Sequence, residues 1–324
     1  MNQVFRTAPS IRRYAGNPIL SAVDVPYPAS LVFNAGVTKW QGRYVMLFRN
    51  DLADPSTRAI TGRNLGLAFS KDGITWKVSD SPINTTPGHP LAGFYDPRLT
   101  VLDGRLYLCF ACGQRGTLGG IAVTDDLEHW EVLNKTVPDN RNLVLFPERI
   151  DGKLVRLERP FAGYLRAGDR FDIWMSQSPD GRYWGDTQLV LACDQLPWTN
   201  DKIGPAAPPL KTPKGWLVLL HAVDRDDSRR WGWEGTWTKR YTMGVALLDL
   251  NNPAKVLGYS RTPIMVPEEP FSYETVGFRP HVLFATGAIL EDTGEVKIYY
   301  GAADTHMALA TAHIADLLAL CEPA

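Results

Sequence analysis

One acidic side chain in this sequence stands at a constrained point of the backbone, and three basic side chains are candidates to face it. Asp96 lies directly before Pro97, whose ring fixes the local backbone. The basic candidates adjoin apolar runs and are Arg141, Arg159 and His221. A guanidinium offers a rigid fork of donors that matches phosphate or carboxylate. One acid that faces several cations suits a reaction in which an anion attacks.

Other catalytic chemistries lack their characteristic residues here. An inverting hydrolase needs a second carboxylate to activate water. Glu148 and Glu158 are candidates, but both are more simply interpreted as salt-bridge partners of neighbouring arginines. There is no G-x-x-x-x-G-K-[ST], H-E-x-x-H or G-x-S-x-G motif, and the remaining histidines show no metal-ligand spacing. We therefore expect no metal site and no cofactor.

Composition and charge exclude several classes of protein. The 324 residues include 34 basic and 35 acidic side chains, so the net charge of −1 gives no reason to expect nucleic acid as a partner. Residues 1–20 lack the apolar core of a signal peptide, and no run of about 18 apolar residues is present to cross a membrane. We expect a cytoplasmic protein with no membrane partner.

The four cysteines are expected to be free thiols in a reducing compartment. Cys109 and Cys112 form a C-x-x-C, but they lie within the apolar run Leu106–Cys112, which predicts a buried strand. No second Cys or His pair follows at ligand spacing, which disfavours a zinc or redox site.

A strand, a tight turn containing glycine and a second strand recur five times along the chain. The first copy is Thr38–Arg49, with its turn at Gln41-Gly42. The other turns are Asp103-Gly104, Asp151-Gly152, Lys214-Gly215 and Thr293-Gly294. Asp-Gly and similar pairs between apolar runs are the strongest short-range sign of a β-hairpin.

A second pattern follows each hairpin. In three copies an apolar strand leads to an Asp and, four residues later, to a Trp: Asp72 and Trp76, Asp126 and Trp130, Asp180 and Trp184. Weaker copies are Met243–Leu250 and Met307–His313.

Two hairpins per unit in five units predict an all-β fold. We expect a five-bladed β-propeller of four-stranded antiparallel blades, with residues 1–324 as a single domain. The alternative is a β-sandwich with coincidental hairpins. Helices are expected only in short segments such as Ile314–Leu320.

Polar residues gather where these hairpins start and end. In a hairpin the start of the first strand and the end of the second lie at the same edge, which in a propeller surrounds the central pocket. The residues expected at this rim are Asn34, Arg49, Tyr95, Asp96, Arg141, Arg159, Lys202, His221 and Asp304. Charge scattered over loop tips is the alternative, but it does not predict a histidine that ends the apolar strand Leu217–His221.

The fourth unit carries a long polar and aromatic insertion, Arg225–Thr238, which contains Trp231, Trp233 and Trp237. Sugar rings stack on aromatic faces, so this insertion is a candidate wall for an acceptor subsite. Packing in the core or in an interface explains the same residues equally well.

At these positions the chain resembles glycoside hydrolase family 130, the mannoside phosphorylases and related mannosidases. The matching segments cover nearly the whole chain in the family's order. They are Asn17–Leu20, Phe33–Gly36, Leu47–Arg49, Tyr95–Arg98, Leu145–Glu148, Leu157–Pro160, Lys202–Gly204 and Tyr300–Thr305. The family is a five-bladed propeller, in agreement with the repeats.

The resemblance implies roles for individual residues. Asp96 matches the family's general acid, which is thought to act through the 3-hydroxyl of the bound mannose. Arg141, Arg159 and His221 match the phosphate-binding positions, a set that the mannosidase branches tend to lose. The residues that match substrate-binding segments are Asn34, Arg49, Tyr95, Lys202 and Asp304.

Two departures from the family pattern concern the acceptor side. The family often has Pro-Asn-Val-x-Phe-Pro where this chain has Pro280–Ala285 with His281, and the insertion Arg225–Thr238 is unusual. Both changes leave the acceptor sugar and the linkage, β-1,2 or β-1,4, open.

The resemblance therefore implies an inverting β-mannoside phosphorylase. It would convert a β-linked mannoside and inorganic phosphate into α-mannose 1-phosphate and a shortened acceptor. A β-mannosidase, a non-catalytic carbohydrate-binding propeller and a different five-bladed glycosidase are the alternatives. The expected partners are a small carbohydrate and phosphate, and the resemblance leaves open whether the chain forms a homo-oligomer.

Overall fold

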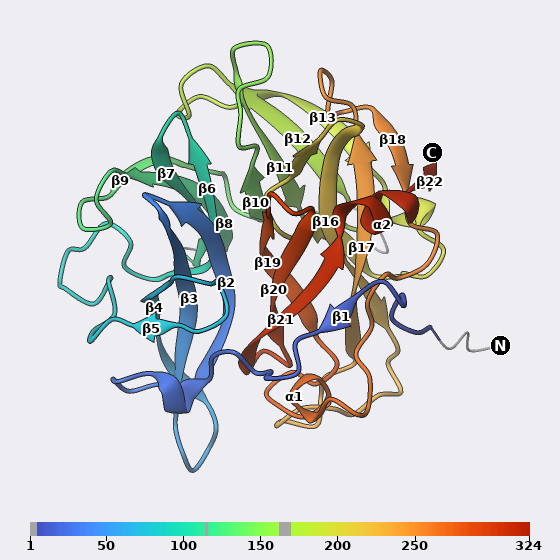
Figure 1. Cartoon of the computed structure of the whole chain (residues 1–324). Helices are drawn as coiled ribbons and strands as arrows, with labels where there is room; N and C mark the ends of the chain where they lie inside the picture. Colours follow the sequence, from blue (N-terminus) through green and yellow to red (C-terminus); the bar gives the residue numbers. More distant parts are fainter. Residues whose placement is uncertain (1–4, 114–115, 162–169) are drawn as a thin grey trace.

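Five antiparallel sheets are arranged as the blades of a propeller in the computed structural model, which describes residues 5–113, 116–161 and 170–324 (Figure 1). The first blade comprises β2 (Leu31–Trp40), β3 (Arg43–Ala53), β4 (Ile60–Ser70) and β5 (Lys77–Val78). The second comprises β6 (Phe94–Leu102), β7 (Arg105–Gly113), β8 (Thr117–Thr124) and β9 (Glu131–Lys135). The third comprises β10 (Asn140–Leu145), β11 (Leu154–Pro160), β12 (Ile173–Ser178) and β13 (Gly185–Leu191). The predicted five-bladed all-β fold is confirmed.

The last two blades deviate from four consecutive strands. In the fourth blade the innermost strand is split into β14 (Lys202–Pro205) and β15 (Leu210–Thr212), which both pair with β16 (Gly215–Arg225). The blade continues with β17 (Lys239–Leu248), β18 (Val256–Tyr259) and the C-terminal β22 (Glu322–Pro323). The fifth holds β19 (Leu283–Leu290), β20 (Glu295–Ala302) and β21 (His306–His313), and its outer strand is the N-terminal β1 (Arg12–Arg13). The two ends of the chain thus complete neighbouring blades.

The hairpin turns follow from the residues predicted for them. Asp103-Gly104 and Asp151-Gly152 both have positive φ at each residue, 51° and 78° in the first pair and 50° and 72° in the second. This geometry matches the right-handed twist of the flanking strands and favours Asp or Asn followed by Gly.

The repeated Asp and Trp close the second hairpin of three blades. The Oδ1 atom of Asp72 accepts hydrogen bonds from the amides of Ile74 and Thr75, at 2.8 and 2.9 Å. Asp126 and Asp180 accept the equivalent pairs of amides. The same turn recurs because an aspartate can accept hydrogen bonds from the backbone amides two and three residues after it, which stabilises the turn locally.

Helices are few and short. They are α1 (Ser272–Thr275), α2 (Ile314–Ala319) and the 3-10 turns η1 (Ala22–Asp24) and η2 (Cys193–Gln195). The helix expected at residues 314–320 is α2. In the described residues no helix has the length and apolar content needed to cross a membrane.

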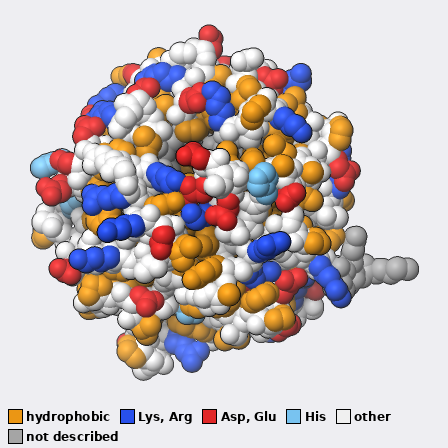
Figure 2. All heavy atoms as spheres, viewed as in Figure 1, with side chains coloured by type: hydrophobic (Ala, Val, Ile, Leu, Met, Phe, Trp, Pro, Cys, Tyr) orange, Lys and Arg blue, Asp and Glu red, His pale blue; other side chains and the backbone are white. Residues whose placement is uncertain are grey.

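Apolar clusters lie between neighbouring blades rather than in one central core. Between the third and fourth blades, Phe146 and Trp216 meet edge to face with their ring centroids 5.2 Å apart. Cys109 and Cys112 are free, buried thiols on β7, as the strand interpretation of the C-x-x-C predicts. On the face shown in Figure 2, basic and acidic side chains are interspersed, consistent with the net charge of −1.

Candidate active site

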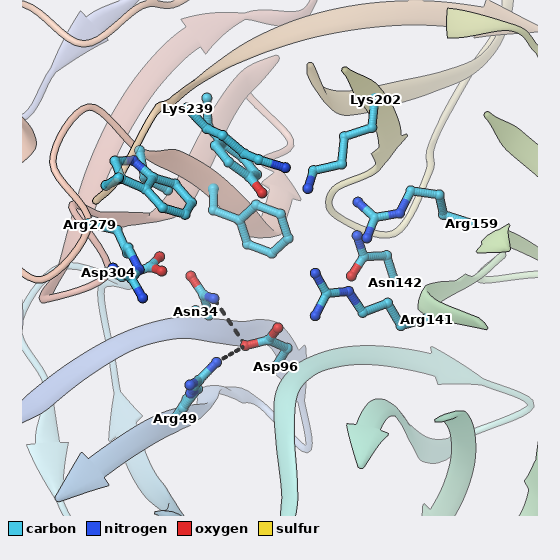
Figure 3. Close-up of a pocket in the computed structure, with 14 residues that line it drawn as sticks. Asn34, Arg49, Asp96, Arg141, Asn142, Arg159, Lys202, Lys239, Arg279 and Asp304 are labelled. Atoms are coloured by element: carbon cyan, nitrogen blue, oxygen red, sulfur yellow. Dashed lines mark hydrogen bonds and ion pairs between the residues drawn. The ribbon is translucent and has the colours of Figure 1, made fainter. Parts of the chain in front are cut away.

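A cavity of about 230 Å³ is lined by residues from all five blades (Figure 3). The lining residues are Asn34, Arg49, Asp96, Arg141, Asn142, Arg159, Lys202, Trp237, Lys239, Tyr241, Arg279, Val282, Phe284 and Asp304. Six of these side chains are basic and two are carboxylates, so the unliganded cavity carries a surplus of positive charge.

Bulges in the inner strands turn three polar side chains into this cavity. The strand register shifts between Phe33 and Gly36, between Tyr95 and Arg98, and between Arg141 and Val144. At these shifts Asn34, Asp96 and Asn142 have φ values of 50°, 51° and 59°. Asn and Asp tolerate this left-handed conformation better than other residues with side chains. The bulge thus explains why the same residue types recur at one position in three blades.

Asp96 is a buried carboxylate held by two donors. Its Oδ1 accepts hydrogen bonds from Asn34 Nδ2 at 3.0 Å and from Arg49 Nη1 at 3.1 Å. Burial alone would raise the pKa of Asp96, but Arg49, Arg98, Asn34 and Arg141 outweigh it and lower that pKa to about 2. In the unliganded protein Asp96 is therefore ionised at neutral pH.

Arg98 stabilises the backbone of Asp96 through a buried hydrogen bond. Its Nη1 donates to the backbone carbonyl of Asp96 at 2.8 Å, and its Nε donates to the carbonyl of Ala206 at 3.0 Å. The Arg98 guanidinium also lies 5.3 Å from the ring centroid of Phe284. One buried side chain thereby joins the second, fourth and fifth blades and fixes the peptide that carries the carboxylate.

Arg159 and Lys202 form the basic end of the cavity with Arg141. Arg159 is 1% exposed, and two of its guanidinium nitrogens, Nε and Nη2, have no hydrogen-bond partner among the described residues. Burial and the neighbouring Arg141 lower the pKa of Arg159 to about 9. Burial and Arg159 lower the pKa of Lys202 to about 8, although Asp201 lies 3.4 Å from its Nζ. Buried cations with free donors are costly unless an anion binds them.

His221 differs from the positive charge that the sequence suggested. It is fully buried behind Arg159, and its Nε2 lies 3.0 Å from Arg159 Nη1 and 3.4 Å from Asn142 Nδ2. Burial and the surrounding basic residues lower its pKa well below the usual value. The imidazole is therefore neutral and accepts from Arg159, so the cationic set consists of Arg141, Arg159 and Lys202. His221 orients Arg159 rather than adding charge.

Asp304 is the second carboxylate of the cavity, and its pKa is shifted in the opposite direction to that of Asp96. Burial and the charges of Asp96 and Asp51 raise its pKa to about 7, although Arg49 and Arg279 act against this rise. Around pH 7, Asp304 is therefore divided between its neutral and charged forms. A neutral carboxyl can donate a hydrogen bond, and a charged one can only accept.

The structure brings most of the predicted site residues together. Asn34, Arg49, Asp96, Arg141, Arg159, Lys202 and Asp304 all line the cavity. Tyr95 does not line the cavity. Its ring lies under the guanidinium groups of Arg49 and Arg63, which are 5.1 Å and 4.5 Å from the ring centroid. Tyr95 thus supports Arg49 and is not a lining residue.

Several lining residues were not predicted. Asn142 directly follows Arg141, and in a regular strand the two would point to opposite faces; only the bulge of β10 brings both to the cavity. Lys239, Tyr241 and Arg279 lie after the insertion or in the connection to the fifth blade, where the repeats give no register. The position of Arg279 shortly before a strand of the fifth blade was an available but weak signal.

The other candidate carboxylates form salt bridges, although only Glu158 pairs with a nearby arginine as expected, whereas Arg149 next to Glu148 pairs with Asp103. Glu158 pairs with Arg156 at 2.9 Å, and Glu148 pairs with Lys211 near the surface. Neither lines the cavity. Among the described residues there is no group of three or more His, Cys, Asp or Glu side chains that could hold a metal ion.

This arrangement suits transfer of a sugar to an anion. Basic side chains gather at one end, an ionised carboxylate lies in the middle, and the polar side chains of Asn34 and Asp304, which have the chemistry to bind hydroxyls, lie beyond it (Figure 3).

Comparison with known proteins points in the same direction. Residues 8–323 match the model of glycoside hydrolase family 130, described as beta-1,4-mannooligosaccharide phosphorylase. A beta-1,4-mannooligosaccharide phosphorylase of Ruminococcus albus is 32% identical over 322 residues, covering 95% of this chain and 90% of the relative. A beta-1,2-mannobiose phosphorylase of Listeria innocua is 30% identical over 365 residues, with 95% and 98% covered.

A solved structure extends this similarity to three dimensions. The beta-1,2-mannobiose phosphorylase of Listeria innocua, in complex with beta-1,2-mannobiose, superposes with a TM-score of 0.81 at 28% identity. The superposition covers 96% of this chain and 98% of that one. The similarity therefore extends over the whole propeller, including the strands that carry the cavity residues.

Proposed function

Because the chain belongs to glycoside hydrolase family 130, we propose that it is an inverting β-mannoside phosphorylase. It transfers a mannosyl group from a β-linked mannoside to inorganic phosphate. The products are α-mannose 1-phosphate and the shortened acceptor. The relatives that match over most of the chain are named as phosphorylases of β-1,2- and β-1,4-linked mannosides, which supports this class of enzyme.

The observation that carries the proposal is the unpaired charge of Arg159. Within the part of the chain that the structure describes, two of its nitrogens are buried without partners, and the adjacent Arg141 and Lys202 add positive charge rather than balancing it. A phosphate dianion at this end would accept those hydrogen bonds and offset the charge. Water could accept those hydrogen bonds but, being neutral, would not offset the charge.

Asp96 is the residue that we assign as general acid. Burial raises the pKa of Asp96, but Arg49, Arg98, Asn34 and Arg141 lower it to about 2, and of these residues Arg141 is assigned to phosphate. When the dianion binds, it offsets Arg141 and adds a negative charge near the carboxylate, and both effects raise the pKa of Asp96. The acid thus gains its proton affinity together with its co-substrate.

The mannosyl group is assigned to the middle of the cavity, between the phosphate end and the mouth. Asn34, Arg49 and Asp304 supply donors and acceptors there for sugar hydroxyls. Asp304 is suited to this role at neutral pH, because its neutral and charged forms are both populated.

The test is an incubation with β-1,2- and β-1,4-mannobiose, each with and without phosphate. We expect mannose 1-phosphate and mannose with phosphate, and a sharp fall in turnover without it. Release of two mannose molecules at the same rate without phosphate would identify a β-mannosidase instead. Binding of mannobiose without any product would identify a carbohydrate-binding propeller.

A further inference from the structure

The insertion in the fourth blade is a hairpin that is docked on the cavity wall. Residues 226–238 join β16 to β17, and Trp231 and Trp237 exchange two backbone hydrogen bonds, each 3.0 Å long. The indole Nε1 of Trp237 donates to the carbonyl of Pro280 at 3.1 Å. The ring of Trp231 lies 4.1 Å from that of His281. These contacts fix the insertion against residues 278–282, the connection that enters the fifth blade.

The two sequence departures of this chain are therefore one structural feature. His281, where an asparagine is common in the family, is the residue on which Trp231 packs. Gly232 allows the close approach, because its φ is 79° and a Cβ there would lie 2.9 Å from the carbonyl oxygen of Phe278. The changed residue and the added hairpin build a single wall.

This wall borders the cavity at the end away from the basic groups. Trp237 and Arg279 both line the cavity. In Figure 3, Arg279 and Asp304 lie on one side of Asp96 and Asn34, whereas Arg141, Arg159 and Lys202 lie on the other. Inversion at the anomeric carbon requires the nucleophile to attack opposite the leaving group. If phosphate occupies the basic end, the acceptor sugar must lie toward Arg279.

The chemistry of the wall suits a neutral sugar. The guanidinium of Arg279 lies 5.0 Å from the Trp237 ring centroid and 4.3 Å from that of Phe278. Its Nη1 lies 3.5 Å from Glu234 Oε2, which belongs to the insertion. Donor and acceptor thus stand side by side next to an aromatic ring, which matches hydroxyl groups on a pyranose. The ion pair with Glu234 offsets the charge of Arg279, which makes this arginine less attractive to an acidic acceptor.

We propose that Trp237 and Arg279, held in place by the hairpin of residues 226–238, form the acceptor subsite and select a neutral sugar. This inference rests on the proposed phosphorylase function. The reverse reaction examines it directly, because the acceptor is then a separate substrate. An acceptor hydroxyl oxygen forms the bond to C1 of mannose 1-phosphate, the C1–O bond to phosphate breaks, and the hydroxyl proton passes to the ionised Asp96.

The experiment measures synthesis from mannose 1-phosphate with glucose, mannose, N-acetylglucosamine or glucuronate as acceptor. Trp237→Leu and Arg279→Ala should raise the acceptor KM at least about tenfold, the loss expected for a charge-assisted or stacking contact. The KM of mannose 1-phosphate should change less than the acceptor KM, because its phosphate is held at the basic end of the cavity and its mannosyl group in the middle. Trp184→Leu is the control: Trp184 makes the same kind of indole-to-carbonyl bond, to Gly181, but lies outside the cavity. It should leave both KM values unchanged.

Glu234→Gln tests the selection of a neutral sugar in a variant that should fold, because this side chain is 61% exposed. Freeing Arg279 should improve the efficiency with glucuronate relative to glucose by about tenfold.

An unchanged acceptor KM in Trp237→Leu and Arg279→Ala, or a wild-type preference for glucuronate, would overturn the subsite alone. A wild-type enzyme that forms no mannoside with any acceptor, and no mannose 1-phosphate from mannobiose, would overturn the phosphorylase function and the subsite with it.

Discussion

Replacing Arg159 with methionine should make the unliganded protein more stable and less able to bind phosphate. Arg159 is 1% exposed and is paired with no carboxylate of residues 5–113, 116–161 or 170–324; its Nη1 faces the neutral His221. Methionine keeps most of the apolar volume and removes the charge. The substitution thus separates what the residue does for folding from what it does for the proposed co-substrate.

The structure gives the size of both effects. Burial and Arg141 lower the pKa of Arg159 from 12.5 to about 9, and each pH unit corresponds to about 1.4 kcal/mol, so the uncompensated charge costs roughly 5 kcal/mol. The substitution also removes the contacts of the guanidinium with His221 and with the aromatic rings of Phe161 and Phe171, and the loss of these contacts offsets part of the gain in stability. We expect a net gain of about 1–3 kcal/mol in the free energy of unfolding, or roughly 2–6 °C in Tm. The Kd of phosphate should rise about ten- to a hundredfold.

Arg156 provides a matched control on the same strand, β11. It is also buried, but it pairs with Glu158 at 2.9 Å and lies outside the cavity. Arg156→Met leaves a buried carboxylate without its partner, which typically costs about 3–5 kcal/mol. We expect this variant to be less stable and to keep the phosphate affinity of the wild type.

The assay is thermal unfolding with and without phosphate, combined with calorimetric titration of phosphate. The wild type and Arg156→Met should both be stabilised by phosphate, and Arg159→Met should respond little at the same concentration. The reasoning fails if Arg159→Met lowers the Tm of the unliganded protein and keeps its full response to phosphate. In that case Arg159 is a structural residue and the phosphate lies elsewhere.

Three further predictions concern the carboxylates and metal. Asp96→Asn should retain the fold and lose about 10²- to 10⁴-fold in turnover, because the amide cannot supply a proton; near-normal turnover would move the acid role to another carboxylate. Asp304 has a folded pKa of about 7, above its usual value, so the unfolded chain releases its proton first, and the free energy of unfolding should fall as the pH rises from 4 to 7. Asp304→Asn should remove that part of the pH dependence in urea titrations, and an unchanged slope would contradict the raised pKa. Activity should survive exhaustive treatment with EDTA; a loss that a divalent ion restores would reveal a metal site.

The repeats made the fold predictable, because each one is a local rule. Asp-Gly at 103 and 151 dictates a tight turn, and the Asp four residues before a Trp caps the next one. What the repeats could not reveal is how the ring closes. β1 holds only Arg12 and Arg13, and it joins β21 through contacts almost 300 residues away in sequence. No local pattern marks so short a strand.

The site was predictable where a strand end fixes a side chain and less so where the backbone departs from a strand. Arg49, Arg159 and Lys202 reach the cavity from regular positions. Asn142 depends on a bulge, and Arg279 depends on the connection between two blades. The charge of His221 was mispredicted because it is set by burial and by its neighbours, neither of which is a property of its own segment.

The charges of the cavity explain why phosphate, rather than water, should be the co-substrate. Without an anion, Arg49, Arg98 and Arg141 hold Asp96 in its ionised form, which cannot donate a proton. Water brings no charge, so it leaves the depressed pKa of Asp96 as it is; it can accept hydrogen bonds from Arg159 but does not balance its charge. A phosphate dianion changes both at once: it satisfies the donors and raises the proton affinity of the carboxylate. In our proposal Arg141 therefore takes part both in binding the nucleophile and in holding Asp96 ionised when phosphate is absent, and a mannosidase built on this scaffold would have to lose the basic set.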